Sequence, residues 1–212
     1  MAHFDLEQQE QIDAIKTWWE RWGNLVTTVV VVAALVVTGL SGWRWYQDRQ
    51  VEGASLLYLA VQEGLQANNQ TRVREAAAQL VEKYPGTGHA VLAALIAARL
   101  DFEGGDSKSA RSRLEWAVAN AKQDEFRDLA RLRLAAVLVD DRDLVAALRV
   151  LDANHGNAFD ALFLDLRGDV LFAQGDANAA RNAYQSAFDK LDEKSSYRNL
   201  VQLKLDALGE AR

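Results

Sequence analysis

The residues of this chain that are best suited to chemistry are few and widely spaced. The sequence has no cysteine, which excludes disulfides, thiolate nucleophiles and cysteine-ligated metals. Its three histidines, His3, His89 and His155, are too scattered to match the spacing of a metal site. We therefore expect no catalytic residue, no metal site and no cofactor, and we predict that the protein is not an enzyme.

Two segments match known ligand-binding loops only in part. Residues 85–89 (Pro-Gly-Thr-Gly-His) could hold an anion, but they lack the lysine and the preceding strand of a phosphate-binding loop. The start of a helix is the simpler interpretation. Asp140, Asp141 and Asp143 could bind calcium, but the glycine and the distal glutamate of a calcium loop are missing. Their charge is better suited to the N-terminus of a following helix.

The overall composition narrows the class of partner and the class of fold. The net charge is −6 over 212 residues, and this acidic balance argues against nucleic acid, whose phosphates require a basic face. Nothing in the sequence indicates a small-molecule substrate. Alanine is abundant and Pro85 is the only proline, which favours long helices over strands. We expect an all-α protein.

The element that must position everything else is an apolar run near the N-terminus. No charged residue occurs between Arg21 and Arg44, and a helix over these positions would be roughly 33 Å long, the thickness of a bilayer's hydrocarbon core. Indole rings gather at the headgroup level of membranes. Five tryptophans flank the run: Trp18, Trp19, Trp22, Trp43 and Trp45. We predict a transmembrane helix over residues 23–43.

Two other interpretations of the run are weaker. A cleaved signal peptide would have a small-residue cleavage site, which the sequence Trp-Arg-Trp-Tyr-Gln at 43–47 does not provide. A buried core helix would have a polar stripe, which this valine-rich run lacks. The flanking charges leave the orientation open, because two basic residues lie near each end: Lys16 and Arg21 before it, Arg44 and Arg49 after it.

The short acidic tail at residues 1–22 has its own pattern. Residues 4–22 read as an amphipathic helix, with Ile12, Ile15, Trp19 and Trp22 on one face. Such a helix can lie flat at the membrane interface. It can also serve as a docking site for a protein on its side of the membrane, and the sequence leaves both interpretations open.

Beyond the apolar run the chain repeats itself. An alanine recurs at intervals of 34, 37 and 33 residues: Ala76, Ala110, Ala147 and Ala180. Four residues after each alanine stands a larger side chain: Leu80, Leu114, Leu151 and Tyr184. Twelve residues before each alanine stands a small one: Gly64, Ala98, Ala135 and Gly168. Small residues let two helices of a hairpin approach closely, while the larger side chain fills the space beside them.

A turn lies between the two helices of each expected hairpin. Residues 103–106, 140–143 and 174–176 combine glycine, which ends a helix in a left-handed conformation, with aspartate, which caps the start of the next. Arg142 replaces the glycine in one turn. A helical hairpin of about 34 residues is the tetratricopeptide unit. We predict a tetratricopeptide-like α-solenoid over residues 44–212, in which residues 188–208 cap the exposed end.

A solenoid of hairpins offers an extended groove lined mainly by the first helix of each hairpin. Its mixture of apolar and charged residues would suit a peptide or a partner helix. Several of the leucines could equally be hairpin core, since a small register error moves a face. The repeat places these residues towards the groove: Leu92, Leu95, Arg99, Phe102, Leu129, Leu132, Asp165, Asp169 and Phe172.

The order of these elements, together with three short motifs, resembles the YfgM-like proteins of Gram-negative bacteria. The motifs are Gly-Trp-Arg-Trp-Tyr at 42–46, Asp-Leu-Arg-Gly-Asp at 165–169 and Gln-Gly-Asp at 174–176. The resemblance covers essentially the whole chain. It implies an ancillary subunit of the Sec translocon in the inner membrane, with a cytoplasmic N-terminus and a periplasmic repeat domain.

Two functional hypotheses follow from the anchor, the repeats and this resemblance. In the first, the protein is a membrane-anchored scaffold that associates with Sec translocon subunits and passes emerging polypeptides to periplasmic chaperones. In the second, it is a structural adaptor for envelope or cell-division machinery that does not touch translocating chains. Because tetratricopeptide arrays serve many assemblies, the fold alone does not exclude the second hypothesis.

Overall fold

The computed structural model describes residues 3–210 of the chain, with side chains described for residues 16–209. The described residues form helices and no strand, so the all-α prediction is confirmed. In chain order the elements are α1 (His3–Gln66), α2 (Gln70–Lys83), α3 (Gly88–Glu103), α4 (Ser107–Asn120), α5 (Asp124–Asp140), α6 (Leu144–Leu151), the short 3₁₀ helix η1 (Asn157–Phe159), α7 (Asp160–Ala173), α8 (Ala177–Lys190) and α9 (Ser196–Glu210).

The contacts within the chain divide it into residues 1–49 and residues 50–212. In the first part, one helix of the described residues is long and apolar enough to cross a membrane. Most side chains of its apolar segment are exposed; Leu35 is 68% exposed and Val37 is 62% exposed. Trp19 and Trp22 are exposed as well, whereas the side chains of Ile12 and Ile15 lie outside the described residues.

The hydroxyl groups of three threonines in this apolar segment are satisfied by hydrogen bonds within the helix itself. The hydroxyls of Thr27, Thr28 and Thr38 each donate to the backbone carbonyl four residues earlier, at 2.7, 2.7 and 2.8 Å. An unsatisfied hydroxyl would be costly in hydrocarbon, and this local bond removes that cost without a partner helix. The segment is therefore compatible with lipid on all sides.

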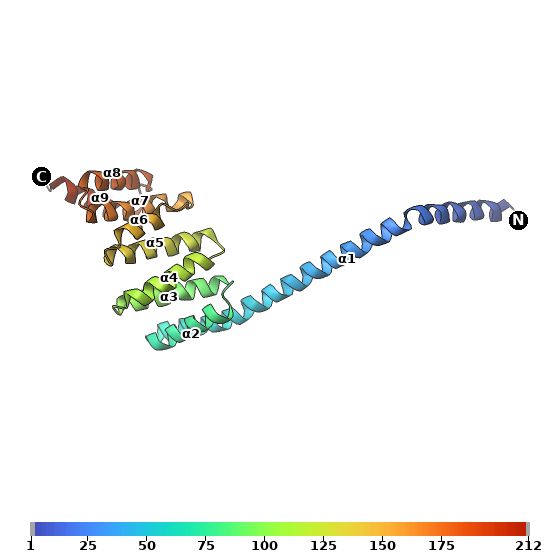
Figure 1. The fold of residues 1–212 in the computed structure, drawn as a ribbon, viewed down its shortest axis with the longest axis horizontal. Coiled ribbons are helices and arrows are strands. Elements are labelled where there is room, and N and C mark those ends of the chain that lie inside the picture. Colours follow the sequence, from blue (N-terminus) through green and yellow to red (C-terminus); the bar gives the residue numbers. More distant parts are fainter. Residues whose placement is uncertain (1–2, 211–212) are drawn as a thin grey trace. The chain divides into compact units, whose positions relative to one another are not determined.

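The second part of the chain is a stack of helical hairpins (Figure 1). Residues 50–66 of α1 pack with α2, and the further pairs are α3 with α4, α5 with α6, and α7 with α8, while α9 packs on α8. Alanine and leucine fill the interior; Ala98 and Ala135 lie in the cluster that joins the middle hairpins. This arrangement confirms the predicted tetratricopeptide-like fold.

One backbone conformation recurs at the turn of every hairpin. Asn68, Gly105, Arg142 and Gly175 have φ values of +52°, +84°, +62° and +87°. This left-handed conformation ends each first helix, and glycine adopts it most readily. Arg142 therefore has the backbone geometry that the repeat pattern assigns to a glycine, although a side chain is disfavoured there.

The residue after each of these turn positions caps the following helix. The side chains of Asn69, Asp106, Asp143 and Asp176 accept hydrogen bonds from backbone N–H groups three residues later, at 3.0, 3.0, 3.2 and 2.9 Å. Each bond satisfies an N–H group that the helix itself leaves unpaired. The helix-capping role predicted for the 140–143 aspartates is confirmed for Asp143.

The small residues of the repeat allow close approach, as their spacing predicts. An added Cβ at Gly168 would lie 2.3 Å from the ring of Tyr184, and one at Gly64 would lie 2.8 Å from the side chain of Val73. Neither separation is tolerated by real atoms. In the last hairpin the ring of the large side chain, Tyr184, therefore stands against Gly168.

Candidate partner-binding groove

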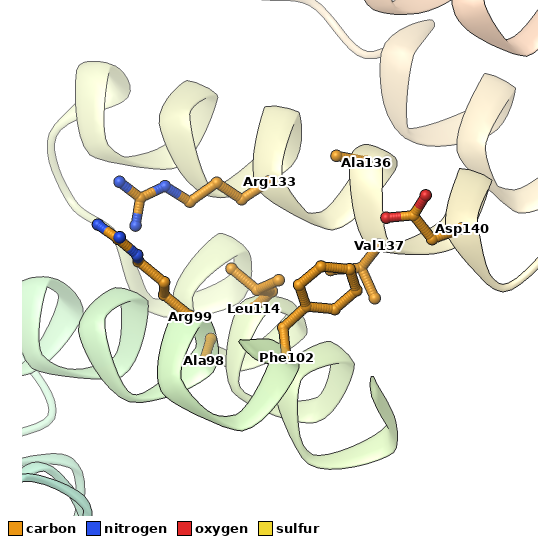
Figure 2. Close-up of a pocket in the computed structure, with 8 residues that line it drawn as sticks. All are labelled: Ala98, Arg99, Phe102, Leu114, Arg133, Ala136, Val137 and Asp140. Carbon is orange, nitrogen blue, oxygen red and sulfur yellow. The ribbon is translucent and has the colours of Figure 1, made fainter. Parts of the chain in front are cut away.

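A pocket opens between the first helices of the two middle hairpins. Its cavity volume is about 260 Å³ (Figure 2). Successive first helices of a solenoid line its groove, so this is the position at which a partner is expected. The lining residues are Ala98, Arg99 and Phe102 from α3, Leu114 from α4, and Arg133, Ala136, Val137 and Asp140 from α5.

The inner surface of this pocket is apolar. Leu114 and Val137 are buried at 2% and 6% exposure and belong to the central cluster of the stack. Phe102 remains 38% exposed, and its ring lies beside Val137 (Figure 2). An apolar surface that is accessible but concave can accept a side chain from another molecule.

Charged residues occupy the mouth of the same pocket. Arg99 and Arg133 reach towards one another at one end, while Asp140 lies at the other end (Figure 2). Arg99 donates from Nε to Glu103 Oε1 at 2.7 Å, and this bond raises the pKa of Arg99. Within the part of the chain that the structure describes, Arg133 donates to the backbone oxygen of Leu95, at 3.3 Å, and to no side chain. Loss of surrounding water lowers the pKa of Arg133, and the neighbouring charge of Arg99 lowers it further.

Only some of the residues that the repeat pattern assigns to the groove lie together in the structure. Arg99 and Phe102 line the pocket. Leu95 is buried in the core at 2% exposure, while Leu129 and Leu132 are partly buried and pack against that core. Leu92 is also partly buried. The partner-binding role of the exposed members of the set stays a prediction.

The predicted residues of the last hairpin form a separate cluster. Asp165 is 2% exposed, and its carboxylate accepts from Lys204 Nζ and from the hydroxyl of Tyr197. Asp169 accepts from the same Lys204 and from the hydroxyl of Tyr184 at 2.7 Å. These contacts fasten α9 and α8 to α7. Both carboxylates are occupied within the chain, and Phe172, at 56% exposure, is the most exposed of the three residues.

The two tyrosines of this cluster have altered acidity. Burial raises the pKa of Tyr184, and the hydrogen bond to Asp169 raises it further. Burial likewise raises the pKa of Tyr197, with a further contribution from its bond to Asp165. Both phenols therefore stay protonated and keep donating throughout the physiological pH range.

Sequence reasoning missed the half of the pocket that α5 contributes. Arg133, Ala136, Val137 and Asp140 are spaced at i, i+3, i+4 and i+7, so they form one face of a helix. That spacing is visible in the sequence. The repeat pattern instead assigns Leu129 and Leu132, one turn earlier, to the groove.

The segments that resembled ligand-binding loops have structural partners. The Thr87 hydroxyl accepts from Ala90 N–H at 3.3 Å and so caps α3, which confirms that residues 85–89 lead into a helix. The ring of His155 stacks on that of Phe163, with ring centroids 3.8 Å apart. His155 Nε2 also lies 3.4 Å from Asp160 Oδ1. Over the residues that the structure describes, no group of three or more histidine, aspartate or glutamate side chains could hold a metal ion.

The fold and the groove define a class: a helical-repeat protein that carries a long apolar helix at its N-terminus. The family described as a tetratricopeptide repeat-like domain matches residues 16–210. The chain is 31% identical over 207 residues to the ancillary SecYEG translocon subunit of Neisseria gonorrhoeae, with 96% of this chain and 98% of that protein covered. Two further ancillary SecYEG translocon subunits are similar. The Haemophilus influenzae protein is 30% identical over 187 residues, covering 87% of this chain and 90% of the relative.

The ancillary SecYEG translocon subunit of Escherichia coli is 27% identical over 204 residues, which cover 95% of this chain and 96% of that protein. The family model, matched over residues 16–210, extends through the apolar helix and all the hairpins. The chain belongs to the YfgM-like family of tetratricopeptide repeat-like proteins, as its sequence motifs predicted.

Proposed function

We propose that this protein is a non-enzymatic scaffold of the inner membrane that associates with the Sec translocon and passes emerging polypeptides towards periplasmic chaperones. Residues 1–22 form the cytoplasmic tail, residues 23–43 cross the membrane, and residues 44–212 form the periplasmic repeat domain. The names of the relatives support the association, since the three described above are ancillary SecYEG translocon subunits.

The observation that carries the proposal is the open pocket between α3 and α5 in a chain that also has an apolar helix long enough to cross a membrane. An anchor limits the distance that the repeat domain can move from the membrane, which raises its effective concentration towards a neighbouring membrane complex. A concave surface with an apolar floor and a charged mouth suits an extended polypeptide. The described residues contain no metal-binding cluster, and among the pocket-lining residues the carboxylate of Asp140 is the group suited to acid-base chemistry.

The test is co-purification of the full chain from native membranes after mild crosslinking. Enrichment of SecYEG subunits should exceed that of unrelated membrane proteins of equal abundance. A matched control carries an unrelated apolar span of the same length in place of residues 23–43. If the intact chain enriches SecYEG no more than it enriches those unrelated proteins, the scaffold proposal is wrong.

A further inference from the structure

Two arginines, Arg99 and Arg133, lie together at the mouth of the pocket (Figure 2). Arg99 shares its charge with Glu103, but no ion pair connects Arg133 to any residue that the structure describes. By contrast, Arg74 and Arg113 both bind the buried Asp101 at 2.6 Å, so their charges are neutralised within the chain. A guanidinium that stands beside another cation and forms no ion pair of its own is better stabilised when an anion joins it.

The surroundings of the pair indicate which kind of anion fits. Glu103 and Asp140 also lie at or near the pocket, so the local charge suits one carboxylate better than a doubly charged phosphate. Guanidinium groups bind carboxylates through parallel hydrogen bonds. The remaining lining, from Phe102 to Val137, is apolar and would accept an adjacent aliphatic or aromatic side chain.

We propose that the pocket between α3 and α5 binds a polypeptide segment in which an acidic residue lies next to an apolar one. The carboxylate is held between Arg99 and Arg133, and the apolar side chain lies on Phe102 and Val137 (Figure 2). The inference rests on the proposed role as a polypeptide-binding scaffold and adds a preference for particular segments. The charge of the two arginines gives the preference for an acidic segment, while the apolar floor of the pocket supplies most of the contact area with the bound polypeptide.

The experiment uses the full chain in detergent and two short fluorescent peptides. One contains a glutamate between leucine and phenylalanine, and its twin has glutamine in place of the glutamate. Because charged hydrogen bonds contribute more than neutral ones, the glutamate peptide should bind about tenfold more tightly, measured by fluorescence anisotropy. Arg133→Gln should abolish this preference and leave the weak binding of the glutamine peptide unchanged.

The matched control is Arg149→Gln, which removes an exposed arginine of α6 that does not line the pocket. This variant should keep the tenfold preference. Equal binding of the two peptides by the unmodified chain, or an undiminished preference in Arg133→Gln, would overturn the inference. So would binding to vesicles of anionic lipid that is lost in Arg133→Gln while neither peptide binds, because the site would then serve lipid.

The same variant separates this inference from the proposed function. Arg133→Gln should still co-purify with SecYEG, since the apolar helix and the rest of the repeat domain are intact. If SecYEG enrichment persists and the peptide preference is absent, the acidic-segment site alone is wrong. If the unmodified chain shows the preference but no SecYEG enrichment, the scaffold proposal fails and the peptide site stands.

Discussion

The ammonium group of Lys204 lies between the carboxylates of Asp165 and Asp169, with Nζ to oxygen distances from 2.7 to 3.0 Å. Lys204 belongs to α9 and the two aspartates belong to α7, so the contact joins the end of the chain to the last hairpin. Asp165 is almost fully buried, and a buried carboxylate requires a partner of opposite charge. The cluster therefore holds the cap of the stack in place.

Lys204→Met should lower the free energy of unfolding of the repeat domain by about 3 kcal/mol, because the buried Asp165 loses its counter-charge. Urea titration of residues 50–212, followed by circular dichroism, measures the change. Lys194→Met removes an exposed lysine and should change stability by less than about 0.5 kcal/mol. Equal effects of the two substitutions would show that the bridge does not stabilise the cap.

Because of Tyr184 and Tyr197, we predict that the repeat domain loses stability at high pH. The pKa of each tyrosine is raised in the folded state above the unfolded value of about 10. Their contribution to the free energy of unfolding is therefore complete below about pH 10. It is lost as the pH rises further, because unfolding then releases a proton. Tyr197→Phe should reduce the steepness of this loss. Urea midpoints between pH 8 and pH 11 measure it, and an identical pH profile in Tyr197→Phe would contradict the assignment.

Arg142→Gly should stabilise the repeat domain by about 1 kcal/mol, because the left-handed conformation at this turn is strained for a residue with a side chain. The gain is limited by the greater freedom of glycine in the unfolded chain. The control is Arg149→Gly within α6, where the same change should destabilise the domain. Destabilisation by both substitutions, seen in urea titrations, would mean that Arg142 has a stabilising contact of its own.

Gly168→Ala should destabilise the last hairpin by about 1 to 3 kcal/mol, since the added methyl group would overlap the ring of Tyr184. The ring cannot move away without breaking its hydrogen bond to Asp169. Asn178→Ala, on the exposed surface of α8, should have little effect. Thermal melting of the two variants tests this, and a Gly168→Ala variant as stable as the parent would show that the helices can separate at no cost.

The turns of the hairpins were predictable from sequence because their signals are local. The interval between Gly105 and Gly175 is two repeats, and it places Arg142 at the same turn position even though its residue type gives no such signal. Capping by Asp143 and Asp176 follows from residue type and spacing in the same way. A regular repeat therefore determined most of the fold.

The candidate site was less predictable because its contacts are distant in sequence. Asp165 was expected to face the groove, but Lys204, 39 residues later, neutralises it and allows its burial. Arg133 of one hairpin lies near Arg99 of the preceding hairpin, and no local sequence pattern predicts that these two side chains are close. A repeat predicts which face of a helix is equivalent to another, whereas side-chain pairing between hairpins depends on residues that the repeat does not constrain.

The most direct test of the scaffold proposal is site-specific photocrosslinking to a polypeptide arrested in the translocon. A photoreactive amino acid replaces Phe102 in the pocket or, as a control, the exposed Ser112 of α4, in the otherwise intact chain. We predict that irradiation of the membranes joins the arrested polypeptide to the Phe102 position and much less to the Ser112 position. Equal crosslinking at both positions, or none at Phe102 with the protein correctly inserted, would contradict the proposal.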